Sequence, residues 1–346
     1  MYTSYSYKDY WERAKKILNK GASMSISPQS ISIASINEVR IGHASDNNAK
    51  TGVTVLYFPD GVEVGCDISG GGPASRETPL AMTGTADNKL NAIVLGGGSA
   101  YGLAAADGVM RCLEENGIGY DTGFAKVPLV CQSDIFDLSY GSATVRPNAE
   151  MGYMACKSAL TQTSDEMGNI GCGTGATVGK INGMQCAQKS GFGWAAARLG
   201  QLTVAAVVCV NALGDIYASD GRRLAGLLTA DRSAFADSTT VFYQNITPHD
   251  LFTGNTTIGA VITNAAFNKA QLCKITSMTR NAYARCIRPV GTMADGDTIY
   301  AASTSEVKED INLVGILSAE VMAKAIENAV VHSKISEEEY LRNIGK

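Results

Sequence analysis

The stretch "TGNTTIGAVITN" (253–264) combines a hydroxyl side chain with residues that let a backbone bend sharply. Thr256 follows Gly254 and Asn255 and precedes an apolar, β-prone run, Ile258 to Thr263. Glycine and asparagine are ordinary turn residues, so one interpretation is a turn before a strand. The other is that the bond between Asn255 and Thr256 is broken, because Gly254 permits a strained backbone and the Thr256 hydroxyl can attack the preceding carbonyl.

A threonine released as an N-terminus would need no second residue as its base. Its own α-amine, with an unperturbed pKa of about 7.7–8.0, can accept the hydroxyl proton at neutral pH. A Ser-His-Asp triad would need a histidine, and this chain contains only three. They are His43, His249 in a predicted surface loop, and His332 near a helix end. The sequence contains neither a Gly-x-Ser-x-Gly elbow nor a His/Cys/Asp cluster with zinc spacing.

Glycine-rich segments offer a second possible site. The 37 glycines concentrate in "SGGGPASRE" (69–77), "LGGGSAYG" (95–102), "GCGTGATVGK" (171–180) and "GFGWAAARLG" (191–200). Loops of this composition can cradle phosphate. However, "GGGSAYG" lacks the dinucleotide spacing, and no hydroxyl residue follows the lysine of "GCGTGATVGK" to hold magnesium. Loops packed closely around an active site are the favoured interpretation.

Composition excludes several classes of protein. The 346 residues are 45% hydrophobic and 18% charged, with a formal net charge of -4 and no basic stripe, so nucleic acid is not an expected partner. The N-terminus lacks the order of a secretory signal, and no segment has the length of a membrane span. Nine cysteines, an odd number without a Cys-x-x-Cys pair, predict buried reduced thiols in a cytoplasmic protein.

The elements that must position these residues form a mixed α/β chain. Residues 1–30 are predicted to be an N-terminal extension, with a short helix around Tyr10 to Leu18 followed by a linker, and 31–346 one catalytic domain. The last residues, "KISEEEYLRNIGK", are expected to form a solvated tail. Strands are predicted at 53–58, 92–95, 202–210, 258–263 and 298–302, and helices at 104–115, 150–159 and 313–331.

Several blocks in one order resemble the self-processing serine/threonine aminopeptidases. That family includes the L-aminopeptidase D-Ala-esterase/amidase, the β-aminopeptidases and the 6-aminohexanoate-oligomer (nylon oligomer) hydrolases. The matching blocks are "IGHASD" (41–46), "DISGGGPASRET" (67–78), "AIVLGGGSAYGLAAADGVMRCLEENGIGY" (92–120), "RPNAEMGYMAC" (146–156), "GTGATVGK" (173–180), "VNALGDI" (210–216), "GNTTIGAVITNA" (254–265) and "DGDTIYA" (295–301).

The resemblance implies a four-layer αββα sandwich, similar to the N-terminal-nucleophile hydrolases but with different strand connectivity. It implies self-cleavage between Asn255 and Thr256, which would give an α-chain of residues 1–255 and a β-chain of residues 256–346. Thr256 matches the nucleophile of the threonine branch. The family also implies a homotetramer of αβ units.

Other site residues follow from the same resemblance. Lys180 matches the lysine beside the nucleophile, where a cation would keep the α-amine neutral and stabilise charge on the hydroxyl oxygen. Asn211 matches the oxyanion-hole asparagine. Without the family, Lys180 would be interpreted as a surface lysine and Asn211 as a turn at a strand end.

The acidic pair Asp295 and Asp297 matches carboxylates that orient the amine and the lysine, and would otherwise be interpreted as a turn or a cation site. One departure is Phe136 in "IFDL", where nylon oligomer hydrolases have a tyrosine. Phe136 is therefore a candidate for the substrate pocket, and its lack of a phenol weakens the expectation of nylon oligomers as the natural substrate.

We therefore predict an amidohydrolase that cleaves small peptides or ω-amino-acid amides through an ester on Thr256, without metal or organic cofactor. Two alternatives remain open. One is an acyltransferase of the ornithine acetyltransferase type on the same fold. The other is an unprocessed small-molecule binding protein built on the glycine loops.

Overall fold

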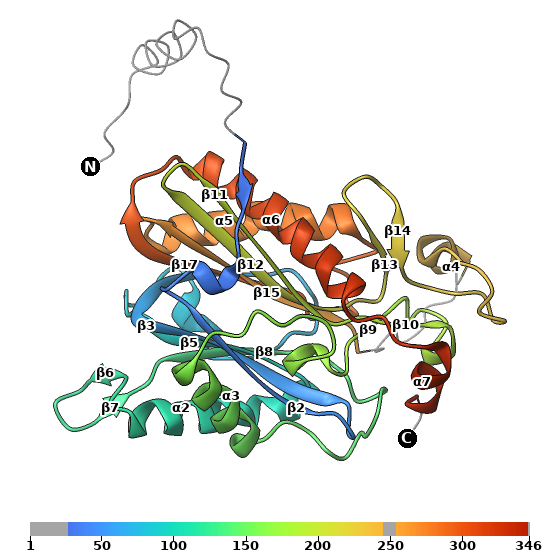
Figure 1. Ribbon diagram of the computed structural model, residues 1–346, viewed down its shortest axis with the longest axis horizontal. Helices are drawn as coiled ribbons and strands as arrows, with labels where there is room; N and C mark the ends of the chain where they lie inside the picture. The colour runs from blue at the N-terminus through green and yellow to red at the C-terminus, as the bar shows by residue number, and fades with distance from the viewer. Residues whose placement is uncertain (1–26, 245–253, 345–346) are drawn as a thin grey trace, which may run out of the picture.

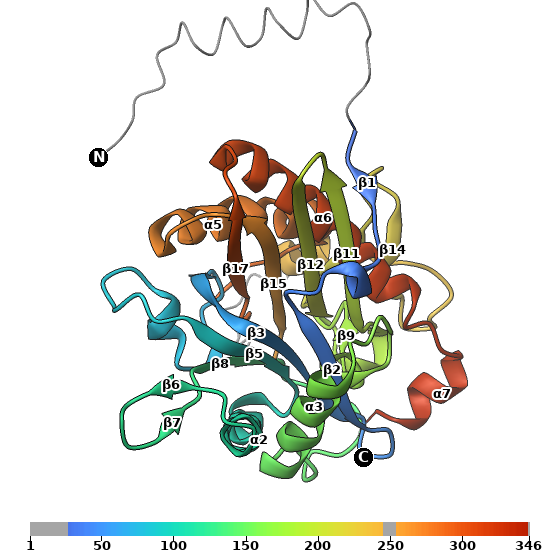
Figure 2. The same ribbon diagram turned by 60° about the vertical axis from the view of Figure 1, so that its left-hand side comes forward.

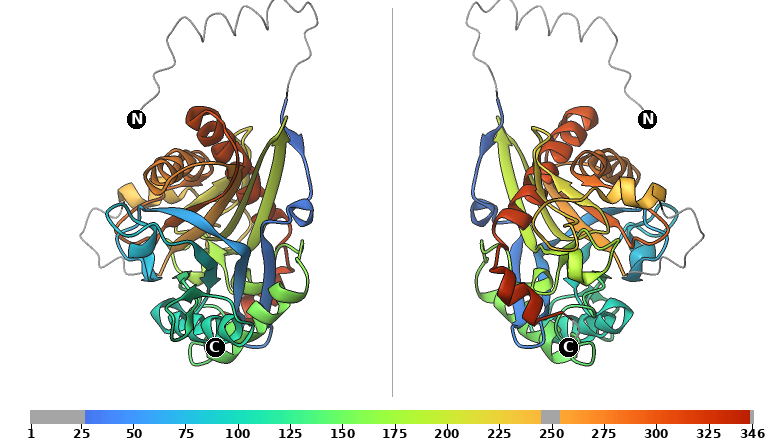
Figure 3. Two further views of the ribbon diagram at one scale, coloured as in Figure 1. Left: turned by 90° about the vertical axis from the view of Figure 1, so that its left-hand side faces the viewer. Right: turned by 90° about the vertical axis from the view of Figure 1, so that its right-hand side faces the viewer.

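Four layers of secondary structure stack in the order helix, sheet, sheet, helix (Figure 1). The computed structural model describes residues 27–244 and 254–344. The predicted helix around Tyr10 to Leu18, and His249, lie outside the described residues. One outer layer consists of α5 (Lys269–Cys286) and α6 (Ile311–Val331), and the other of α2 (Ala105–Glu115) and α3 (Ala149–Thr161). Figure 3 shows the same order of layers from two sides.

Two sheets fill the space between the helices. The first contains β1 (Gln29–Ser30), β11 (Phe192–Leu199), β12 (Leu202–Asn211), β15 (Thr256–Ala265) and β17 (Thr298–Val307), of which the last four lie side by side in Figure 2. The second contains β2 (Arg40–Asp46), β3 (Thr51–Ile68), β5 (Leu90–Gly96), β8 (Val130–Asp134) and β4 (Ala74–Arg76). This αββα arrangement confirms the predicted fold class.

The long strand β3 connects the two sheets. Its first part, residues 51–57, pairs with β2 and β5, whereas residues 63–68 pair antiparallel with β17. The pairing with β5 is irregular between Tyr57 and Val62. The sequence predicted only 53–58 of this strand, because polar residues interrupt the apolar pattern beyond Phe58.

Strand β12 shows how a continuous apolar run serves two cores. Successive side chains of a strand point to opposite faces. Val204, Ala206, Val208 and Val210 accordingly pack under α5 and α6. Ala205, Val207 and Cys209 pack between the two sheets. A strand buried on both faces is therefore apolar throughout, which is why 202–210 could be predicted from the sequence.

Close approach of helix and sheet depends on missing side chains. A Cβ atom at Gly193 of β11 would lie 2.3 Å from the carbonyl oxygen of Ala325 in α6. The stretch "GFGWAAARLG" was predicted to be a glycine loop, and this prediction was wrong, since residues 192–199 form β11. The glycine there serves packing against a helix rather than a turn.

Helix α5 was missed by the sequence analysis. It contains many Lys, Thr, Arg and Asn residues and has only a modest apolar face. Its start is fixed by a capping box, in which the Asn268 side chain accepts from the Gln271 N–H and the Gln271 side chain accepts from the Asn268 N–H. The predicted helices 104–115, 150–159 and 313–331 are confirmed as α2, α3 and α6.

The C-terminal segment is not a solvated tail. It contains α7 (Glu337–Arg342), and Tyr340 is 2% exposed because its ring stacks on Tyr140 at 5.4 Å between centroids. The hairpin of β9 (Thr177–Val178) and β10 (Gln188–Lys189) packs against the end of the first sheet. Beside it lie β13 (Asp215–Tyr217), β14 (Arg223–Ala225), β16 (Ile287–Arg288) and α4 (Ser238–Gln244). The remaining hairpin pairs β6 (Tyr120–Asp121) with β7 (Lys126–Val127).

Candidate active site

Three neighbouring strands bring the predicted site residues to one end of the first sheet. Thr256 opens β15 and pairs in register with Asn211, which closes β12. Strand β17 runs parallel to β15, and the turn before it places Asp295 in a bridge with Asn255. These residues are at most 4% exposed. Residues from distant parts of the sequence thus meet in one buried cluster.

The bond between Asn255 and Thr256, which the sequence predicts to be cleaved, lies within this buried cluster. The carbonyl oxygen of Asn255 accepts a hydrogen bond from the backbone N–H of Gly296 at 2.9 Å. The Thr256 hydroxyl donates to the same carbonyl oxygen. The Thr256 hydroxyl and the Gly296 N–H therefore both contact the carbonyl group of Asn255.

Lys180 contacts the backbone next to this bond. Its Nζ donates to the carbonyl oxygen of Gly254 at 3.1 Å and to that of Asn211 at 2.9 Å. Lys180 is 3% exposed, so the alternative of a surface lysine is wrong. Burial lowers its pKa to about 7, while the nearby Asp295 opposes that lowering. A substantial fraction of neutral amine is therefore available near pH 7.

Asn211 is held by contacts at both ends of its side-chain amide. Its Oδ1 accepts from the Thr177 N–H at 3.0 Å, and its Nδ2 donates to the Phe136 carbonyl at 2.9 Å. A longer contact of 3.4 Å joins Nδ2 to the Gly254 carbonyl. The amide of Asn211 thus faces Gly254, and the Gly296 N–H contacts the carbonyl of Asn255.

The two predicted carboxylates organise the turn beside Thr256. Asp297 accepts from the backbone N–H of Thr257 at 2.6 Å and of Gly291 at 3.0 Å. Asp295 accepts from the N–H and the hydroxyl of Thr292, at 2.8 and 2.7 Å. Burial raises the pKa of both carboxyls, and the neighbouring Asp295 raises that of Asp297 further. The interaction between the two carboxyls therefore opposes ionisation of both at once.

Gly254 has a conformation and a contact that few other residues would permit. Its φ is +60°, in the left-handed region. A Cβ atom there would lie 2.1 Å from the ring of Phe136. Phe136 is only half-buried, and its ring packs against Gly254, two residues before Thr256. Its role in a substrate pocket stays a prediction.

Sequence reasoning did not single out Gly296, which lies within the quoted "DGD" motif. Its contribution is a backbone N–H, so residue type gives no direct signal. The requirement for glycine can nonetheless be derived from the space around it, because a Cβ atom would lie 2.9 Å from both the Gly72 carbonyl oxygen and the Thr256 hydroxyl oxygen. A glycine between the two aspartates therefore allows this turn to approach the Thr256 hydroxyl closely.

Metal-ligand clusters are not found in the part of the chain that the structure describes: no group of three His, Cys, Asp or Glu side chains could hold an ion. All nine cysteines are free, and only Cys273 is more than marginally exposed. His43 is partly buried and contacts Phe192 and Thr54. Among the described residues, no helix has the length and apolar character that crossing a bilayer requires.

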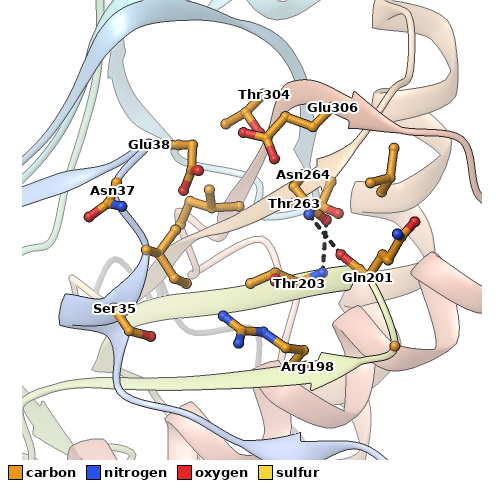
Figure 4. A pocket seen from close by; sticks show the side chains of 14 residues that line it. Ser35, Asn37, Glu38, Arg198, Gln201, Thr203, Thr263, Asn264, Thr304 and Glu306 are labelled. Atoms are coloured by element: carbon orange, nitrogen blue, oxygen red, sulfur yellow. Dashed lines mark hydrogen bonds between the residues drawn. The ribbon is translucent and has the colours of Figure 1, made fainter.

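The structure also contains a pocket away from this site. A pocket of about 530 Å³ lies at the opposite ends of β12, β15 and β17, lined by polar residues that include Arg198, Glu38 and Glu306 (Figure 4). Most of its lining is open to solvent. The residues that the sequence predicts for the chemistry lie at the Thr256 end, where a hydroxyl, a buried lysine and a backbone donor converge.

The sequence matches Peptidase family S58 over residues 32–339. The chain belongs to peptidase family S58. Its relatives include an uncharacterized aminopeptidase of Mycobacterium leprae, 37% identical over 300 residues that cover 80% of this chain and 79% of that protein. Another is a 6-aminohexanoate-oligomer endohydrolase of an Agromyces species, 33% identical over 273 residues that cover 78% of this chain and 74% of that one.

Solved structures agree on the fold of this S58 peptidase. A β-aminopeptidase of a Burkholderia species superposes with a TM-score of 0.64 at 19% identity, covering 92% of this chain and 96% of that one. The L-aminopeptidase D-Ala-esterase/amidase of Ochrobactrum anthropi gives 0.62 at 16% identity, covering 90% and 92%. Its structure is described as a variant of the Ntn hydrolase fold. The chain is accordingly a hydrolase of peptide or amide bonds.

Proposed function

We propose that this S58 peptidase cleaves its own chain between Asn255 and Thr256 and then uses the released Thr256 as its nucleophile. The observation that carries the proposal is the pair of hydrogen bonds that the Asn255 carbonyl oxygen accepts, one from the Gly296 N–H and one from the Thr256 hydroxyl. A backbone donor in this position stabilises the negative charge that develops on the carbonyl oxygen during attack.

Self-cleavage requires a base other than the α-amine. In the uncut chain the nitrogen of Thr256 is an amide, which cannot accept the hydroxyl proton. Lys180 is the best candidate, since it is buried beside Gly254 and its pKa is lowered to about 7. The neutral amine accepts the hydroxyl proton, the oxygen adds to the Asn255 carbonyl carbon, and the Thr256 nitrogen leaves after protonation. Water then hydrolyses the resulting ester and releases both chains.

Turnover follows the same course with a substrate in place of Asn255. The α-amine of Thr256 serves as base, and the substrate's acyl group forms an ester on the hydroxyl oxygen while its amine leaves. Departure of residue 255 vacates the position of its carbonyl beside Gly296. Asn211 provides a second donor once Gly254 no longer occupies its amide. Lys180, Asp295 and Asp297 supply the charges that orient the new α-amine.

Small amides with a free amino end are the proposed substrates. The names of the relatives, aminopeptidase and 6-aminohexanoate-oligomer endohydrolase, point to N-terminal residues of peptides or to ω-amino-acid oligomers. Buried carboxylates beside Thr256 suit recognition of a substrate ammonium group. Assembly into a homotetramer of αβ units and residence in the reducing cytoplasm complete the proposal; eight of the nine free thiols are buried.

A denaturing gel separates this proposal from a binding protein without processing. Cleavage predicts pieces of about 27 and about 9.5 kDa, at about 105 Da per residue, from the 36.3 kDa chain. A single band at the full mass would contradict the proposal. N-terminal sequencing of the smaller piece should begin Thr-Thr-Ile-Gly.

Product analysis then separates hydrolysis from acyl transfer. The processed protein is incubated with aminoacyl and β-aminoacyl p-nitroanilides and a 6-aminohexanoate oligomer, with and without an added acceptor amine such as ornithine. Free acid as the main product in both cases supports the hydrolase. Acylated amine as the main product would favour an acyltransferase on this fold.

A further inference from the structure

Lys189 is a second buried lysine near the site, and it takes no part in the chemistry proposed for Thr256. It closes β10 and is 8% exposed. Its Nζ donates to the carbonyl oxygens of Gly173 and Ala176, each at 2.9 Å, and to that of Ser190. Each hydrogen of an ammonium group thus has a backbone acceptor.

The surroundings of Lys189 favour the charged form more than burial alone would suggest. Burial lowers its pKa to about 7, with Lys50 acting in the same direction and Asp137 and Glu339 opposing. A neutral amine has only two hydrogens to donate, so its lone pair would face the third carbonyl. The three carbonyls therefore oppose deprotonation.

A short path of backbone contacts leads from Lys189 to Asn211. Gly173 and Ala176 belong to the segment that ends in Thr177, and Thr177 pairs in register with Lys189. The Thr177 N–H donates to Asn211 Oδ1. That bond decides which end of the amide is oxygen, and so directs the NH2 group to Phe136 and Gly254.

We propose that Lys189 is a positioning residue, whose ammonium group holds the segment 173–177 so that Thr177 fixes the orientation of the Asn211 amide. The inference rests on the proposed oxyanion role of Asn211. Without the cation, all three buried carbonyls lose a charged donor, and those of Gly173 and Ala176 keep only the backbone N–H groups of Ala176 and Ser190. The segment then shifts to find other partners. The Asn211 amide then loses its alignment, although every residue of the proposed chemistry is still present.

Lys269 offers a matched control. It is also a buried lysine, 4% exposed, and its Nζ donates to the Thr85 hydroxyl at 2.9 Å and the Ala86 carbonyl at 2.6 Å. None of these residues contacts the site around Thr256. Lys269 also forms an ion pair with Asp87 at 3.8 Å. Lys269→Met therefore reproduces the loss of a buried ammonium from its acceptors without touching the segment that holds Asn211.

The experiment compares Lys189→Met with Lys269→Met for thermal stability, rate of self-cleavage and kcat per processed molecule. Both variants should lose stability. Lys189→Met should lower kcat by about 10- to 100-fold with a much smaller change in KM, because misalignment near the reacting atoms has effects of this size. Lys269→Met should retain kcat. Lys189→Arg, which keeps a cation, should recover part of the loss and supplies the data if Lys189→Met does not fold.

A double-mutant cycle with Asn211→Ala tests the path itself. If Lys189 acts through Asn211, adding Lys189→Met to Asn211→Ala should lower kcat by no more than about twofold. Losses that multiply would overturn the inference while leaving the role of Asn211 intact. Near-normal kcat in Asn211→Ala alone would instead remove Asn211 from the proposed chemistry, and the Lys189 inference with it.

Discussion

The two ends of β12, β15 and β17 differ in how they present polar groups. At the Thr256 end, the polar side chains are almost completely buried and contact backbone atoms of Gly254 and Thr257. At the other end, Glu306 and Arg198 line a large open pocket and remain exposed to water. The same strands therefore carry a small, dense cluster and a wide, solvated hollow.

This difference shows that volume is a poor guide to chemistry in this fold. Water screens charges in the open pocket, so their interactions are weaker there than between buried groups. At the buried end, a charge changes the pKa of its neighbour, as the raising of the Asp297 pKa by Asp295 shows. Variants at each end can break or sharpen this contrast.

Thr256→Ala should have the largest effect. Alanine has no hydroxyl to attack the Asn255 carbonyl, so we expect a folded precursor that stays uncut and shows no turnover. Intact mass and the circular dichroism spectrum check both expectations. Thr256→Ser should still cleave, since serine loses only the methyl group.

Thr257→Ala is the internal control for that result. Thr257 carries the same hydroxyl one residue later, and its side chain points to the opposite face of β15. Its variant should still be cut between residues 255 and 256. Cleavage that persists in Thr256→Ala, or fails only in Thr257→Ala, would show that Thr256 is not the nucleophile.

Asn211→Ala should come next, with kcat lowered by about 10²–10³-fold if the amide is a main oxyanion donor during turnover. Self-cleavage should slow less, because the Gly296 N–H already contacts the Asn255 carbonyl in the uncut chain. Steady-state kinetics on processed enzyme and a time course of chain cleavage measure the two effects separately. Equal losses in both would mean that Asn211 serves both reactions alike.

The pH dependence of self-cleavage should reveal Lys180 as the base. Because burial lowers the pKa of Lys180 to about 7, its neutral form increases with pH up to that value and then saturates. The cleavage rate should therefore rise about tenfold per pH unit below about 7 and level off above it. Precursor from cell-free synthesis, transferred to buffers between about pH 5.5 and about 8.5, provides the time courses.

Lys180→Arg separates this base from the neighbouring carboxyls. A guanidinium stays protonated throughout the range, so this variant should cleave slowly and lose the rise near pH 7. An unchanged profile would assign the base to Asp297, whose raised pKa also places its ionisation above that of an ordinary carboxyl.

Much of the sheet could be predicted because its strands obey simple patterns. Strands β12 and β15 are apolar runs, as expected for strands buried on both faces, and Thr256 could be found at the start of one of them. Helix α5 could not, since its many polar residues hide a narrow apolar face that only the packing on β3 and α6 reveals. Strand β11 was hidden by glycines that serve close packing.

The site divides in the same way. Asn255, Thr256 and the acidic pair lie in two short motifs, so they could be recognised in the sequence as candidate site residues. The burial of Lys180 and the three carbonyl contacts of the Lys189 Nζ depend on the β9–β10 hairpin. Its strands have two residues each, so they leave almost no periodic signal in the sequence. The Gly296 N–H belongs to the backbone and has no residue-type signature.

Glu306→Gln at the open end should have the smallest effect. Burial and the adjacent Glu38 raise the pKa of Glu306, so the neutral amide relieves repulsion between two carboxyls without changing the size of the side chain. Surface changes of this kind alter stability by no more than about 0.5 kcal/mol, and kcat should stay within about twofold of the parent. Kinetics and thermal unfolding of Glu306→Gln beside Asn211→Ala test the contrast directly. A tenfold loss in Glu306→Gln would mean that the two ends of the strands are coupled, because no described contact joins Glu306 to Thr256 and the signal would have to travel through the strands.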